Sequence, residues 1–136
     1  MLSSRVVWLS HHPPAQYDRC IRIGRHHVCR RCAVLYPLAF ATTAASLLGW
    51  AWPAAWDQTL LWLLPLPVTL EFFLERFGSL RYRPTRQLVL TIIAAPALGR
   101  GFARYLAHPG DSLFWTMVLV FGGTCLVALL ATRRRP

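Results

Sequence analysis

The sequence predicts an all-α, polytopic membrane protein with four transmembrane helices preceded by a short cytosolic segment rich in cysteine and histidine. The 136-residue chain is 55% hydrophobic and only 15% charged, a composition that excludes an ordinary soluble domain. Four stretches approach the ~20 apolar residues that a helix needs to cross a hydrocarbon core of ~30 Å. All 15 basic residues are arginines. Most of them lie before the first stretch, between the second and the third, or after the fourth, as expected for cytoplasmic segments.

The expected spans, in chain order, are residues 33–52, 58–77, 87–106 and 112–132. The first and the fourth carry no charged residue. Pro53 is expected to close the first span, and Pro65 and Pro67 to kink the second, because proline removes an amide donor from the helical ladder. Pro96 is a candidate kink in the third. The chain then divides into an N-terminal segment (1–32), a helix bundle (33–132) and a basic tail (133–136).

The arginines also orient the bundle, because loops rich in arginine stay in the cytoplasm. With the N-terminus inside, every arginine except Arg100 and Arg104 falls on the cytoplasmic side. The loops near Asp57 and Asp111 then face outward, and Arg100 and Arg104 are expected to snorkel to the outer headgroups. Both termini are therefore predicted to be cytoplasmic.

Metal-ligating side chains crowd into the N-terminal segment. Cys29 and Cys32 have the two-residue gap that lets both sulfurs reach one ion. In a reducing cytosol, clustered thiols bind metal or do redox chemistry, and disulfides are rare. Zinc is the expected ion and iron the second choice, because thiolate and imidazole ligands suit both. The remaining ligands are expected among Cys20, His11, His12, His26 and His27.

A redox dithiol is the main chemical rival of the metal site. In that interpretation the neighbouring Arg30 and Arg31 lower the pKa of the Cys29 and Cys32 thiols. Cys125 lies in the fourth span, where we expect a small buried apolar residue and not a ligand.

Glu71 is the second candidate, because a carboxylate at membrane depth must be paired, protonated or in contact with a water-filled pocket. The second span runs inward, so Glu71 lies near its cytoplasmic end, level with the cysteines. We expect it in the bundle interior near Arg86. One interpretation is a buried structural ion pair between these two residues. The other is catalytic, with Glu71 as general base and Arg86 steering a phosphorylated lipid or isoprenoid.

The formal net charge of +10 raises the question of a nucleic-acid partner. The topology itself requires these arginines, and no nucleic-acid-binding motif is present. We therefore expect no nucleic acid and instead expect membrane lipids, through anionic headgroups at the cytosolic face. The same arginine surface could meet a protein partner.

Two blocks of the chain resemble the prokaryotic membrane proteins grouped as domain of unknown function 2085. The first block is residues 11–14 (HHPP), Gly24 and residues 29–36 (CRRCAVLY). The second matches a proline, an acid, a glycine and an arginine further on, here Pro67, Glu71, Gly78 and Arg86. The resemblance covers about residues 10–100. It implies a prokaryotic inner membrane location, the predicted topology and the position of the metal site, but no substrate, because the family has no assigned activity.

The chain departs from that family signature at two positions. It has Ser10 where the family has a cysteine before the first histidine, and Val34 where the family has glycine. Cys20 is the candidate to replace the missing ligand; otherwise the site is degenerate or empty. Two functions follow, a non-enzymatic membrane module held together by a closed zinc site, or a membrane-embedded metalloenzyme with an open coordination position.

Overall fold

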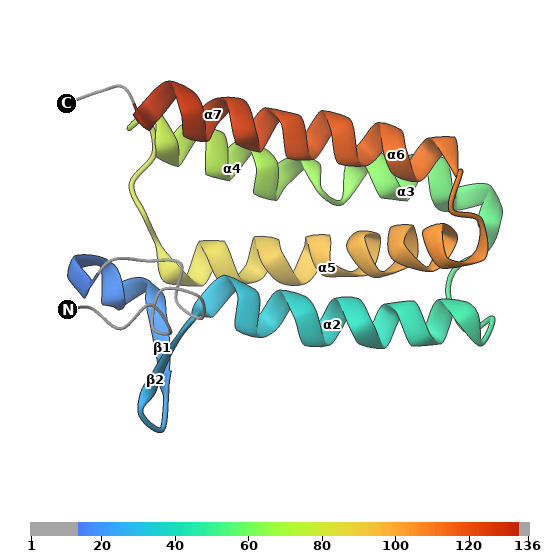
Figure 1. Ribbon diagram of the computed structural model, residues 1–136, viewed down its shortest axis with the longest axis horizontal. Coiled ribbons are helices and arrows are strands. Elements are labelled where there is room, and N and C mark those ends of the chain that lie inside the picture. Colours follow the sequence, from blue (N-terminus) through green and yellow to red (C-terminus); the bar gives the residue numbers. More distant parts are fainter. Residues whose placement is uncertain (1–13, 134–136) are drawn as a thin grey trace.

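The computed structural model describes residues 14–133, and these residues are mostly helical. They begin with a short 3₁₀ turn and a two-stranded antiparallel hairpin. Four helical columns follow and lie side by side, with the hairpin at one end of the bundle, next to the start of the first column (Figure 1). The elements are η1 (Pro14–Arg19), β1 (Cys20–Ile23), β2 (His26–Cys29), α2 (Arg30–Leu47), η2 (Ala54–Trp56), α3 (Asp57–Leu63), α4 (Leu66–Arg76), α5 (Pro84–Ala107), α6 (Ser112–Met117), the π-helical turn η3 (Val118–Gly122) and α7 (Gly123–Arg133).

The hairpin is the element that an all-α prediction misses. Its turn contains Gly24, whose φ of 60° is readily adopted only by glycine. Register is set by this turn, which places Cys20 opposite Cys29 and Ile23 opposite His26. The strands are only four residues each, too short for their hydrophobic alternation to stand out in the sequence.

The first column, α2, starts and ends earlier than predicted. It begins at Arg30, directly after the hairpin, and ends at Leu47, so Pro53 does not close it. Gly49 does, with a φ of 78°. The amide of Gly49 donates to the Ser46 carbonyl and that of Trp50 to the Ala45 carbonyl, which are the two hydrogen bonds of a Schellman C-cap.

The second column is broken into α3 and α4 at Pro65, as the prolines predict. α5, in contrast, runs through Pro96 without a break. The fourth column is one helix with a π-helical turn between α6 and α7. α2 packs along α5, and α4 packs against α5 and α7.

Within the described residues, one helical stretch is long and apolar enough to cross a membrane by length and composition, Ser112–Thr132, with a mean hydropathy of 2.2. The other three predicted spans do not meet these criteria, so four transmembrane helices are not supported on this basis. α2 opens with two arginines, the second column is two short helices, and α5 carries Arg86, Arg100 and Arg104.

Small and polar residues form much of the interior of the bundle, with Leu61 and Met117 as large apolar exceptions, whereas many large apolar side chains lie outside. Ala95, Ala97 and Thr91 of α5 are almost completely buried. A Cβ at Gly99 would collide with the backbone carbonyl of Ala39, so α2 and α5 approach as closely as their backbones allow. The exposed residues on the helical columns include Phe40, Leu63, Leu70, Ile92, Leu119 and Val127.

Candidate functional site

Three of the predicted ligands converge at the junction of the hairpin and α2. Cys20 and Cys29 face each other across the strands and are both buried. Cys32 lies in the first turn of α2, and its thiol shares a hydrogen bond with Cys29. The hairpin register therefore brings Cys20 to the CxxC pair, although it lies nine positions before Cys29 in the sequence.

The two histidines of the hairpin, His26 and His27, do not complete this cluster. His26 pairs with Ile23 beside the turn and is exposed on the strand face opposite to Cys29. The ring of His27 is stacked on Tyr17, with 4.0 Å between the ring centroids. His11 and His12 lie outside the described residues. Within residues 14–133, no group of three or more His, Cys, Asp or Glu side chains is arranged to hold a metal ion.

The thiols are not those of an activated dithiol. The hydrogen bond to Cys29, followed by burial, raises the pKa of Cys32 well above its ordinary value, and the nearby Arg31 does not offset this. Burial also raises the pKa of Cys20. A nucleophilic redox cysteine needs a lowered pKa, so these shifts run opposite to what the redox interpretation requires.

Glu71 lies in the bundle interior next to Arg86, as predicted. Its side chain is 2% exposed, and its Oε1 accepts a hydrogen bond from Arg86 Nε at 2.9 Å. Its Oε2 accepts from Arg31 Nη2 at 3.3 Å. Arg31 was not among the predicted site residues, although its place beside Cys32 on α2 was a usable signal. Because both carboxylate oxygens are held by guanidinium groups, the geometry is that of a structural ion pair.

Further charged residues surround Glu71 at the same end of the bundle. Arg19 pairs with Glu75 at 2.6 Å. Arg76 donates its Nε–H to the hydroxyl of Thr132, which ties α4 to α7. We call this set the hairpin-end cluster; it comprises Arg19, Arg31, Glu71, Glu75, Arg76 and Arg86.

A second cluster lies at the opposite end, where the sequence predicted outward-facing loops and snorkelling arginines. The expected snorkelling of Arg100 and Arg104 is wrong, because both side chains pair with Asp57; the side of the membrane on which these loops lie stays a prediction. Asp57 is buried, and its carboxylate accepts hydrogen bonds from Trp52 Nε1 and Arg100 Nε, both at 2.8 Å. Arg104 bridges Asp57 and Asp111, at 2.8 and 2.6 Å. We call these five residues the far-end cluster.

α3 starts at Asp57 and packs on α5. The Asp57 carboxylate therefore meets Arg100 and Arg104 inside the fold. Sequence position alone could not show this, because Asp57 and Arg100 are 43 residues apart.

The chain matches no family model, no curated protein and no solved structure. The resemblance described for about residues 10–100 therefore stays a prediction.

Proposed function

We propose that this chain is a small integral membrane protein with four crossings, in which Cys20, Cys29 and Cys32 bind a zinc ion that fastens the hairpin to the bundle. Its role is that of a structural or interaction module at the cytosolic face. The observation that carries the proposal is the convergence of the three cysteines beside a helix bundle that buries several polar side chains and exposes many large apolar ones.

The inverted polarity supports membrane insertion. In water, each exposed apolar side chain would forgo roughly 25 cal/mol per Å² of burial, whereas in lipid this exposure costs nothing. Asp57 and Glu71 are buried and held by arginines, the usual condition for ionised groups within a bundle. α5 has 24 residues, about 36 Å at 1.5 Å per residue, enough to cross the hydrocarbon core.

Topology is the first test of this proposal. A reporter fused to either terminus should be cytoplasmic, and one inserted near Asp111 should face outward, because arginines concentrate at the hairpin end. Accessibility to a membrane-impermeant thiol or protease reagent measures this in intact cells. Cytoplasmic labelling of the loop near Asp111 would contradict the four-crossing topology.

The zinc site needs one ligand beyond the three cysteines. His11 or His12, outside the described residues, is the proposed donor, since His26 faces away and His27 stacks on Tyr17. Four protein ligands would then fill the coordination shell of the zinc ion, and a structural site of this kind contributes folding free energy. This would fix the hairpin against α2 in a chain with little soluble core.

Metal analysis of the protein purified in detergent tests the site. We expect about one zinc per chain, lost in the double variant Cys29→Ser/Cys32→Ser and in Cys20→Ser. Cys125→Ser is the matched control, because Cys125 lies on α7 and should leave the metal content unchanged. His27→Ala should also retain zinc, whereas His11→Ala/His12→Ala should lose it. Full occupancy in the double cysteine variant would end the hypothesis.

A further inference from the structure

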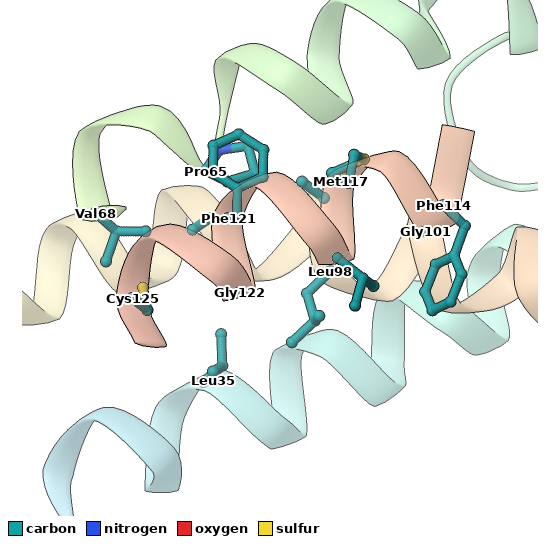
Figure 2. Close-up of a pocket in the computed structure, with 13 residues that line it drawn as sticks. Leu35, Pro65, Val68, Leu98, Gly101, Phe114, Met117, Phe121, Gly122 and Cys125 are labelled. Carbon is teal, nitrogen blue, oxygen red and sulfur yellow. The ribbon is translucent and has the colours of Figure 1, made fainter. Parts of the chain in front are cut away.

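The bundle contains an apolar cavity that its own side chains do not fill. Its volume is about 400 Å³, and its lining residues come from α2, α4, α5 and the fourth column, which consists of α6, η3 and α7. Figure 2 shows Leu35 of α2 pointing into the space below Phe121 and Cys125, with Val68 of α4 on the other side. The cavity is partly open to the surroundings of the bundle, and its volume falls in the range of ligand pockets, roughly 300–1,000 Å³.

The apolar cavity leads towards the hairpin end of the bundle. A neighbouring cavity of about 230 Å³ shares Leu35, Val68 and Cys125 with it and adds Arg31 and Phe72. A third cavity of about 690 Å³ is lined by Arg31 and Phe72 in turn. The three cavities therefore lie in a row with shared wall residues, apolar in the middle of the bundle and polar at its hairpin end, and we call this row the path.

The polar end of this path carries excess positive charge. Its lining includes Arg19, Arg31 and Arg76 against a single carboxylate, Glu75, which pairs with Arg19. Arg31 also pairs with Glu71, outside this lining, but shares that carboxylate with Arg86. The contact of Arg76 with Thr132 is with a neutral hydroxyl. The Nε–H of Arg31 is buried and has no hydrogen-bond acceptor within residues 14–133. Leaving that donor unsatisfied is costly. The Nε itself is shielded, but the Arg31 side chain is 20% exposed, and guanidinium groups pair well with anionic oxygens.

We infer that this path binds a membrane lipid with an anionic phosphate headgroup, its acyl or isoprenyl chain in the apolar cavity and its phosphate against Arg31 and Arg76. The almost wholly apolar lining of the inner cavity does not suit ordered water, which needs two to four polar partners. A free phosphate would leave that cavity without an occupant. The lipid site depends on the membrane placement proposed above, but it does not depend on zinc.

Photolabelling in lipid nanodiscs tests the inference. The nanodiscs consist of phosphatidylcholine with a trace of diazirine-labelled lipid, either phosphatidic acid or phosphatidylcholine. We expect the phosphatidic acid probe to label peptides containing Val68 or Cys125 at least about fivefold more, the ratio expected for one arginine near a phosphate. Unlabelled phosphatidic acid should compete, and inorganic phosphate should not. Equal labelling by the two probes, or equal competition by inorganic phosphate, would overturn the lipid site.

Adjacent glycines offer a matched pair of variants. Gly122 lines the apolar cavity and Gly123 does not, and a Cβ at either position meets no atom within 4 Å. Gly122→Leu should fill the cavity and abolish selective labelling, whereas Gly123→Leu should keep it. Unchanged selective labelling in Gly122→Leu would refute the cavity as the binding place.

The headgroup end is tested by Arg76→Gln, which leaves the Glu71 ion pairs in place and should lower the phosphatidic acid preference about fivefold. Arg22→Gln on the hairpin, which removes the same charge outside the path, should not change it. Equal losses in these two variants would show general surface attraction and overturn the inference. Flotation of the reconstituted protein with vesicles separates this failure from failure of the membrane proposal itself.

Discussion

The two ends of the bundle hold buried carboxylates in different ways. At the far end, Asp57 accepts hydrogen bonds from Trp52, from Nε and Nη2 of Arg100 and from Nη1 of Arg104, and Arg104 also engages Asp111. Two aspartates there balance two arginines. The hairpin-end cluster has four arginines but only two glutamates. The far-end cluster is therefore balanced in charge and holds the helices together, and we call it a clasp. The hairpin-end cluster has more arginines than carboxylates, which favours an anion there.

The cavities follow the same division. The far-end cavity, about 320 Å³, is lined by Arg100, Arg104 and Asp111 and shares no lining residue with the apolar cavity. The hairpin-end cavity shares Arg31 and Phe72 with the cavity of about 230 Å³, which in turn shares Leu35, Val68 and Cys125 with the apolar cavity. A buried ion pair by itself thus indicates neither stability nor function; the charge balance and the adjoining space distinguish the two roles.

Asp57→Asn is expected to have the largest effect on stability, because it leaves Arg100 and Arg104 without the carboxylate that they share. Removing one partner of such a buried network costs about 3 kcal/mol. Denaturant or thermal unfolding in detergent measures the change in the free energy of unfolding. Asp18→Asn is the matched control, since Asp18 is exposed on η1. A similar cost for both variants would break the interpretation of the far end as a clasp.

Glu71→Gln should cost less, about 2 kcal/mol, because the Glu71 carboxylate accepts two hydrogen bonds from arginines, whereas that of Asp57 accepts four hydrogen bonds. Glu71→Gln/Arg86→Gln should recover part of the loss, since the second change removes an unpaired charge. Unfolding measurements on the two single variants and the double variant complete the cycle.

The same variant separates the structural interpretation of Glu71 from the catalytic one. If Glu71→Gln left stability and metal content intact, the structural interpretation would fail and a general base acting on a phosphorylated lipid or isoprenoid would be favoured. Glu75→Gln provides the comparison at a carboxylate of the same end that lies outside the Arg31 and Arg86 pairs.

The smallest effect is expected for Asp111→Asn, because asparagine keeps the side-chain acceptor that caps α6 at the Phe114 amide. The hydrogen bond from Arg104 holds the pKa of Asp111 below the ordinary value of 3.8. Because this pKa is lower in the folded state, the ionised carboxylate stabilises the fold at pH values above 3.8. That contribution is lost as the pH falls through the lowered pKa. Wild type should therefore be the more stable at pH 7, and its melting temperature should approach that of the variant as the solution is acidified. A difference that persists at low pH would show that the charge of Asp111 is not its cause.

Local sequence patterns predicted much of the helical framework. The apolar runs located four helical columns, and Pro65 marked the break in the second. Glu71 was placed near Arg86 because a carboxylate at that depth needs a partner, and 15 residues bring the two to the same end of adjacent helices. Helix ends were less predictable, since Gly49 and not Pro53 provides the C-cap of α2.

The sequence by itself determined the helical class, the concentration of arginine at one end of the bundle and the presence of the CxxC pair, because these depend on composition and on residues close together in the chain. The tertiary structure alone decided that Cys20 faces Cys29, that Arg31 reaches Glu71 and that Asp57 draws Arg100 and Arg104 inward. The last two are contacts across 40 to 47 residues of sequence. The packing of the helices, and not any local preference, selects which carboxylate meets which arginine, because an ion in a low-dielectric interior must be paired with whatever opposite charge the fold places beside it.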